Sequence, residues 1–381
     1  MRSSKKILFN LNTFPVSGNI IPLVERIRFW QKKNYTLIVF SSRALKEKID
    51  SLIKLGENHQ FIELENCREV TSKLAFITES LKRNIRSLRY LRELKMRIDG
   101  GIIFSISTVL DLVFIPYIIK SRKKSTKWVV VFDNTVPFTG SGNKLIRFMN
   151  WSFFQISSCL IKKADRIFVS SENVIPFLKR RRFEPERILS TGNGVEADLI
   201  RKAKVDPEYK IDALFIGRIN EAKGIYEMLK VLELVVKDIP SFQLAIMGSG
   251  DDTTVAKYRE QINKMKLARN VQFLGYKNGQ EKFNIIKSSK CFWFFSESEG
   301  FPVSLMEAVS SGLQCFVYYL PAYDYYKNSE LMIFKQKDST AVAKAVIDLF
   351  KKKDFENKAG SALLDVFSWA RIAEMEFEST L

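Results

Sequence analysis

Histidine, cysteine and long apolar runs are all scarce in this sequence of 381 residues. It has one histidine, His59, and four cysteines that lie far apart and form no Cys-x-x-Cys pair. Zinc sites and disulfide frameworks need such residues at close spacing, so the sequence favours neither. This use of cysteine is typical of a reducing compartment, and we expect a cytoplasmic protein.

No stretch of the sequence is long and apolar enough to predict a membrane-spanning helix. The most apolar run, residues 109–119, contains Asp111 and Pro116 and is too short to cross a bilayer. The first residues have only a short apolar run before Asn10 and Asn12, which favours a first strand over a signal peptide. A hydrophobic content of 46% and a charged content of 27% are typical of a globular protein, and the length allows two domains.

Acidic residues are scarce in the first half only. Residues 1–205 hold 38 Lys and Arg against 18 Asp and Glu, a net charge of +20, whereas residues 206–381 hold 23 against 24. A basic excess confined to one half favours a polyanionic partner, either an anionic membrane surface or nucleic acid. Because no nucleic-acid-binding motif accompanies the charge, we predict peripheral association with an anionic membrane and no nucleic-acid partner.

The first half alternates strand-like and helix-like segments. Residues 5–12, 35–42 and 59–64 are predicted strands with helical segments between them, a rhythm that indicates a parallel doubly wound sheet. Gly18 opens the first helical segment, where a backbone amide could face an anion, although a plain turn fits equally well. Residues 201–210 are polar and predict an interdomain linker.

Two amphipathic helices stand out in the first half. In residues 72–97, basic side chains alternate with a stripe formed by Leu81, Ile85, Leu88, Leu91 and Leu94, which we expect to pack inward while the charges face out. The charged face suits water or a membrane surface. Residues 144–163 are rich in aromatic side chains, which fit either core packing or an interfacial helix beside an acceptor site.

The second half repeats the strand–loop–helix pattern and places chemistry in its loops. Arg218 and Lys223 follow one predicted strand and could converge on a phosphate or diphosphate, although a surface ion pair also fits Arg218. Gly248 and Gly250 follow the next strand and would let the backbone approach a ligand. Such loops lie at the carboxyl ends of the strands, where ligands bind in open α/β sheets.

The stretch SESEGFPVSLMEAVSSG, residues 296–312, carries two carboxylates. Glu299 is predicted in the loop after the apolar strand CFWFF, and Glu307 in a helix that Gly312 ends. Carboxylates can accept hydrogen bonds from sugar hydroxyls, or can act as the acid and base of a glycoside hydrolase. The basic loop at Arg218 and Lys223 favours the first interpretation, because hydrolysis of a simple glycoside needs no diphosphate clamp.

These motifs resemble the retaining glycosyltransferases of family 4, which have the GT-B architecture. The similarity rests on the GR…KG loop, the GSG turn, VQFLGY and above all the E-x7-E motif with its G-F-P insert, and also on ADRIFVSSE, NGV and FSW. It implies an α/β fold with two Rossmann-like doubly wound domains facing across a cleft. Residues 1–205 would bind the acceptor, residues 206–363 the nucleotide-sugar, and a helix in residues 364–381 would cross back to the first domain.

The resemblance also implies roles for individual residues. Arg218 and Lys223 would hold the diphosphate and stabilise the leaving group, and Glu299 would bind hydroxyls of the donor sugar. Glu307 would bind the ribose hydroxyls, and no metal or cofactor is implied. The donor-binding set would comprise Gly18, Gly217, Gly248, Gly250, Tyr276, Gly300, Phe301, Pro302, Val303 and Glu307.

The sequence departs from the family pattern at two places. Where members often carry a histidine, it has Asp133 and Asn134, and Asp133 could replace the histidine on the acceptor side or cap the turn. Where members often have a Gly-Gly loop, it has LPAYDYY, residues 320–326.

From the resemblance as a whole we expect a hexosyltransferase that moves a sugar from a UDP- or GDP-sugar to a lipid-linked or membrane-proximal glycan, with retention of anomeric configuration. A non-catalytic GT-B-fold binding or scaffold protein is the alternative.

Overall fold

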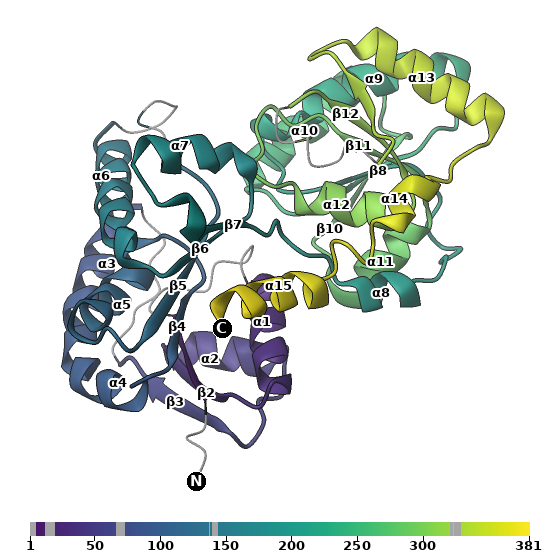
Figure 1. The fold of residues 1–381 in the computed structure, drawn as a ribbon. Coiled ribbons are helices and arrows are strands. Elements are labelled where there is room, and N and C mark those ends of the chain that lie inside the picture. Colours follow the sequence, from purple (N-terminus) through teal and green to yellow (C-terminus); the bar gives the residue numbers. More distant parts are fainter. Residues whose placement is uncertain are drawn as a thin grey trace. The chain divides into compact units, whose positions relative to one another are not determined.

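The computed structural model describes residues 5–11, 20–65, 73–136, 138, 144–320, 323 and 329–381. They form two compact units, the first comprising Met1–Asn193 with Trp369–Leu381 and the second Gly194–Ser368 (Figure 1). Among the described residues, no helix combines the length and apolar character needed to cross a membrane.

The first unit is built on a parallel sheet of seven strands in the order β3-β2-β1-β4-β5-β6-β7. The change of direction falls between β1 and β4, as in doubly wound folds. Consecutive residues of β1 face opposite sides: Ile7 and Phe9 enter one core cluster, Leu8 the other. The strands are β1 (Lys6–Leu11), β2 (Thr36–Ser41), β3 (His59–Glu63), β4 (Ile102–Ser105), β5 (Lys127–Phe132), β6 (Arg166–Val169) and β7 (Ile188–Ser190).

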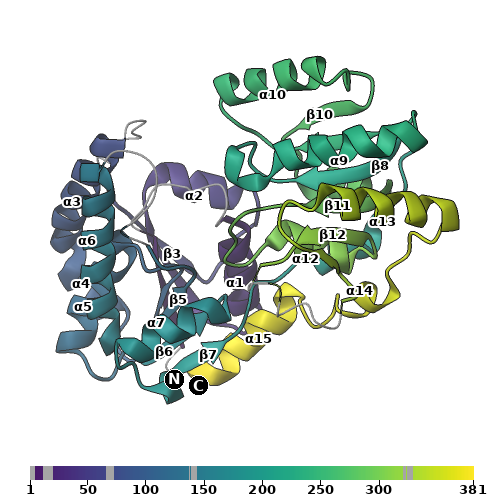
Figure 2. The same ribbon diagram turned by 90° about the horizontal axis from the view of Figure 1, so that it is seen from above.

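Helices cover both faces of this sheet (Figure 1 and Figure 2). One face packs on α1 (Ile20–Lys32), α2 (Arg43–Asp50) and α15 (Trp369–Thr380). The other packs on the 3₁₀ helix η2 (Leu88–Tyr90), α4 (Leu91–Arg97), α5 (Leu110–Arg122), α6 (Lys144–Leu160) and α7 (Ile175–Arg180), and α3 (Lys73–Ser87) packs on α5 and α6. A buried ion pair fixes α15 to α1: Glu376 accepts from Arg26 Nε at 2.8 Å and from Arg26 Nη2 at 2.5 Å.

The prediction for the face of α3 was wrong. Leu81 and Ile85, expected to pack inward, are 43% and 67% exposed, while Arg83, expected to face water, is 1% exposed. The cause is Asp111 in the first turn of α5, a fully buried carboxylate that needs partners. Arg83 pairs with Asp111, which also accepts hydrogen bonds from Ser80 and, at 2.6 Å, from Asn84. A polar face of α3 therefore turns inward.

The second unit is a parallel sheet of six strands in the order β10-β9-β8-β11-β12-β13. The first four residues of the apolar run CFWFF lie in β11 as predicted, Phe295 follows the strand, and the side chains of the run are buried. The strands are β8 (Ile211–Ile216), β9 (Leu244–Met247), β10 (Val271–Gly275), β11 (Ser289–Phe294), β12 (Gln314–Tyr318) and β13 (Met332–Phe334). The direction changes between β8 and β11.

Helices also lie on both faces of the second sheet. Helices α9 (Ile225–Asp238) and α13 (Ser339–Lys352) pack together on one face, and α8 (Ala197–Lys202), α11 (Gly279–Lys287) and α12 (Val303–Ser310) lie on the other (Figure 1). The unit also holds α10 (Asp252–Lys264) and α14 (Lys358–Ala362). Gly312 follows α12 with a φ of +83°, the left-handed conformation that commonly ends a helix.

The division between the units lies between Asn193 and Gly194, whereas the sequence placed a boundary at 205/206 and a linker at 201–210. The segment after Asn193 is held by the second unit. Helix α8 packs on α11, and the backbone N–H of Asp206 donates to Ser288 Oγ at 2.8 Å. These contacts explain why a polar, linker-like stretch belongs to a folded unit.

Candidate functional site

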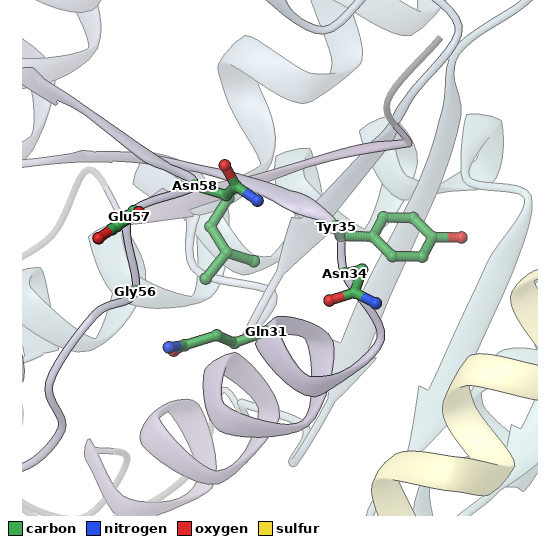
Figure 3. A pocket seen from close by; sticks show the side chains of 7 residues that line it. Gln31, Asn34, Tyr35, Gly56, Glu57 and Asn58 are labelled. Carbon is green, nitrogen blue, oxygen red and sulfur yellow. The ribbon is translucent and has the colours of Figure 1, made fainter. Parts of the chain in front are cut away.

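The carboxyl edge of the second sheet, at β8 and β11, holds most of the predicted site residues. This is the switch point of a doubly wound sheet, where two neighbouring loops run to opposite faces and leave room for a ligand. A different pocket, of about 300 Å³, lies beside Gln31, Asn34 and Tyr35 at the amino end of β2 in the first unit (Figure 3). It is lined by none of the predicted site residues and lies at the wrong strand ends for a doubly wound active site.

Lys223 and Glu299 meet at the switch point. Lys223 ends the 3₁₀ helix η6 (Glu221–Lys223) after β8, and its Nζ lies 2.5 Å from Glu299 Oε1 in the loop after β11. The side chains are only 17% and 11% exposed. Ser296 donates its hydroxyl to the same carboxylate oxygen at 2.5 Å. A cation and a carboxylate therefore stand side by side at the sheet edge.

Glycines let three strand-end loops pack against one another here. A Cβ on Gly248, which has φ +150°, would lie 1.8 Å from the carbonyl oxygen of Gly217, and one on Gly224, at φ +70°, would lie 2.1 Å from that of Phe295. Hydrogen bonds join the same loops, since Ile219 donates to Ser249 O at 2.8 Å. The contacts that these glycines permit are within the protein itself, between the loops that carry the candidate site.

Glu307 forms a second charged cluster, inside α12. Its Oε1 lies 2.6 Å from Lys282 Nζ of α11, and Glu196 Oε2 lies 3.7 Å from the same nitrogen. Lys282 and Glu307 are 13% and 8% exposed. Burial by itself would lower the pKa of Lys282, but the neighbouring Glu307 carboxylate outweighs it, so the pKa of Lys282 is raised. The cluster keeps one cation between two carboxylates.

The remaining predicted residues of the second unit lie before or after these two clusters in the chain. Arg218 is exposed, and Tyr276, after β10, is 65% exposed. Gly300, Phe301 and Pro302 lead into α12, which Val303 begins, and Pro302 at the N-cap makes no side-chain capping hydrogen bond. The amino end of a helix attracts anions through its dipole and its unpaired amides. Gly18 lies outside the described residues.

Asp133 and Asn134 lie in the first unit, after β5. Asn134 is exposed, whereas Asp133 is half-buried and its carbonyl accepts a hydrogen bond from Ser170. Burial raises the pKa of Asp133 to about 6, against the opposing charge of Arg26. A carboxyl group that titrates near neutrality at the carboxyl edge of a sheet is a candidate for proton exchange or hydroxyl contact.

Sequence reasoning missed three side chains of the second unit. Ser296 and Tyr323 flank Glu299: Ser296 hydrogen-bonds to it, and the charge of Glu299 adds to burial in raising the pKa of Tyr323. Lys282 lies in a helix with no motif of its own. The sequence carried a signal for two of them: Ser296 stands three residues before Glu299 in the quoted motif, and Tyr323 lies in the LPAYDYY stretch.

Within the part of the chain that the structure describes, no three His, Cys, Asp or Glu side chains gather as a metal site would require. The absence of a metal from the reaction remains a prediction.

Comparison with known proteins identifies what this arrangement resembles. Residues 196–363 match the family model for glycosyl transferases group 1. A poly(glycerol-phosphate) alpha-glucosyltransferase of Bacillus subtilis is 29% identical over 51% of this chain. A UDP-Gal:alpha-D-GlcNAc-diphosphoundecaprenol alpha-1,3-galactosyltransferase of Escherichia coli is 29% identical over 37%. The matches span only 29% and 38% of these two relatives.

Solved structures show the same fold over nearly the whole chain. Sucrose-phosphate synthase from Thermosynechococcus elongatus superposes with a TM-score of 0.76 at 14% identity, over 99% of this chain and 98% of that one. The pneumococcal O-GlcNAc transferase GtfA, solved with UDP and GlcNAc, gives a TM-score of 0.70 at 12% identity, over 100% and 99%. The predicted GT-B fold class is confirmed. These structures show the fold, and the family model matches the second unit only.

Proposed function

We propose that this chain is a retaining hexosyltransferase that uses a nucleotide-sugar donor and glycosylates a lipid-linked or membrane-proximal glycan. The observation that carries the proposal is the contact between Lys223 and Glu299 at the switch point of the second sheet. A nucleotide-sugar presents a diphosphate next to the hydroxyl groups of its sugar. Lys223 offers a cation to the diphosphate, and Glu299 offers a carboxylate to the hydroxyls.

The leaving group of this reaction is a nucleoside diphosphate, on which negative charge develops in the transition state. We assign Lys223 and Arg218 to that charge, together with the amino end of α12 after Gly300, Phe301 and Pro302. In this proposal no metal or other cofactor takes part, so EDTA should leave the transfer rate unchanged. A rate that falls with EDTA and returns with Mg²⁺ or Mn²⁺ would contradict this.

Glu299 is assigned to hydroxyl recognition and not to nucleophilic attack. Its Oε1 already accepts from both Lys223 and Ser296, and such contacts lower the nucleophilicity of a carboxylate. The proposed base is therefore the departing phosphate itself, with the acceptor attacking on the leaving-group face. Glu307 is assigned to the ribose hydroxyls.

The assignment of the acceptor is supported by the names of two relatives and by the net charge of residues 1–205. The names of two relatives state a poly(glycerol-phosphate) acceptor and a diphosphoundecaprenol-linked acceptor. Residues 1–205, with a net charge of +20, suit an anionic surface on which such acceptors reside. We place the protein in the cytoplasm, peripherally bound to the membrane, with Asp133 and Asn134 on the acceptor side.

A thermal-shift screen with UDP- and GDP-sugars tests the donor. A ligand at 100 times its Kd should stabilise the protein by about 2.7 kcal/mol. Transfer to an undecaprenyl-diphosphate glycan, with the product's anomeric configuration read by ¹H NMR, then tests the reaction. Glu307→Ala should abolish the shift, whereas Glu281→Ala, which removes an exposed carboxylate from the neighbouring helix, should keep it.

The outcomes separate the hypotheses. Unchanged donor affinity in Glu307→Ala would contradict the ribose assignment, and an inverted product would contradict retention. Donor binding without any transfer or donor hydrolysis would favour a non-catalytic GT-B binding protein.

A further inference from the structure

The outward face of α3, η2 and α4 combines apolar and basic side chains, and its one partly exposed acid between residues 78 and 96, Glu93, pairs with Arg97. Between residues 78 and 96 the exposed side chains are Thr78, Leu81, Lys82, Ile85, Leu88, Arg89, Arg92 and Met96. They recur at intervals of mostly three or four residues, so they line one side of the helical segment. We call this set the outer stripe.

The outer stripe exists because the inner face is polar. Arg83 and its neighbours are committed to Asp111 of α5, which leaves the leucine and isoleucine side chains on the water side. Ile85 is 67% exposed and Met96 is 62% exposed. A run of exposed large apolar side chains among cations indicates an interaction surface and not an ordinary solvated helix.

A groove of about 390 Å³ runs along the end of the outer stripe. It lies between η2, α4 and the end of α5 and is lined by Leu88, Arg89, Leu91, Arg92, Lys95, Met96, Arg122 and Lys123. Neighbouring cations are neutralised: Lys123 pairs with Asp99, and Arg97 with Glu93. Within the described residues, Arg89, Arg92, Lys95 and Arg122 have no ion-pair partner, so the groove is cationic with an apolar lining.

We propose that the outer stripe and this groove dock on an anionic lipid bilayer, with phosphate headgroups at the arginines and the apolar side chains at the acyl boundary. An interfacial helix needs both components, since charge brings it to the surface and apolar side chains hold it there. Nucleic acid would use the cations but leave Leu81, Ile85 and Leu88 without a partner. The lipid surface is the partner whose chemistry matches both.

The inference rests on the membrane association in the proposed function and not on its sugar transfer. The binding assay contains neither donor nor acceptor, so vesicle binding and sugar transfer can fail independently.

Flotation of the full chain with vesicles tests the proposal. We expect binding to phosphatidylcholine vesicles that contain phosphatidylglycerol, weak binding to phosphatidylcholine alone, and loss of binding at about 1 M salt, where the Debye length is about 3 Å. Each basic residue near the surface is worth about fivefold in partitioning, so Arg89→Gln with Arg92→Gln should weaken binding about 25-fold. The control pair Lys179→Gln with Arg180→Gln removes the same charge from the end of α7 and should stay within about threefold of the parent.

The apolar component needs its own variant. Ile85→Ser should weaken vesicle binding about tenfold without lowering the urea midpoint, because the side chain is already exposed. Val205→Ser, which changes a 65% exposed side chain in the second unit, is the matched control and should bind like the parent.

Three results would overturn the proposal. The first is that the parent protein does not bind anionic vesicles. Another is an equal loss of vesicle binding in the double variant of Arg89 and Arg92 and in the control double variant of Lys179 and Arg180, which would indicate a general effect of net charge. The last is tight binding to a single-stranded oligonucleotide that Ile85→Ser leaves intact, together with no preference for vesicles, which would assign the surface to nucleic acid.

Discussion

Replacing Lys282 with methionine should destabilise the second unit strongly, although Lys282 belongs to no sequence motif. The side chain is 13% exposed and its Nζ lies 2.6 Å from Glu307 Oε1 and 3.7 Å from Glu196 Oε2. Methionine keeps most of the apolar stem but leaves two poorly solvated carboxylates without their cation. Removing one partner of a buried ion pair typically costs about 3–5 kcal/mol, and we expect this range for Lys282→Met.

A matched control lies five residues earlier. Lys277 pairs with Glu281 at 2.6 Å, but these side chains are 28% and 52% exposed. Water screens such a pair, so Lys277→Met should cost less than about 1 kcal/mol. The same substitution then separates burial from the mere presence of an ion pair.

Urea unfolding followed by hydrogen exchange in peptides of α11 and α12 measures both variants and reports the second unit separately from the first. Adding Glu307→Gln to Lys282→Met should recover about 2 kcal/mol, because the stranded charge on α12 is removed. If Lys282→Met costs no more than Lys277→Met, the cluster is open to water and the reasoning fails. Donor affinity, measured on the folded fraction, should also fall in Lys282→Met, since Glu307 loses the group that positions its carboxylate.

Three further predictions concern other parts of the chain. The folded state holds the Asp133 proton up to about pH 6, while the unfolded chain releases it near 3.8, so stability is lost as pH rises between these values. In urea titrations, the free energy of unfolding of Asp133→Asn should therefore match that of the parent at about pH 4 and exceed it by about 2–3 kcal/mol at about pH 8. A gain in stability that does not depend on pH would contradict this. Glu376→Gln leaves Arg26 buried without its carboxylate and should cost about 3–5 kcal/mol of unfolding free energy, against less than about 1 kcal/mol for the exposed Glu374→Gln; equal losses in thermal unfolding would refute the buried pair. Gly248→Ala places a Cβ 1.8 Å from a carbonyl oxygen and should disrupt the loops around Lys223, whereas Gly275→Ala meets no atom within 4 Å and should cost only about 1–2 kcal/mol for its positive φ; circular dichroism and donor binding would distinguish them.

Local sequence patterns were enough to predict the layered α/β fold and the strand ends at which a site would lie. Buried parallel strands are continuous apolar runs, as in CFWFF, and their period differs from that of helices, so local pattern is enough to place them. The E-x7-E spacing likewise put Glu299 in the loop after β11 and Glu307 in α12, where the structure has them. Such local features depend on neighbours in the chain.

Tertiary structure decided the partners of charged residues and the orientation of α3. Lys223 finds Glu299 across 76 positions of sequence, and Lys282 finds Glu307 across 25, through loops and helices that only the folded sheet brings together. Helix α3 turns a polar face inward because Asp111, 28 positions beyond Arg83, is buried at the start of α5 and must be neutralised. Hydrophobic periodicity predicts the inward face only when the neighbouring surface is apolar, and here the buried carboxylate reversed that preference.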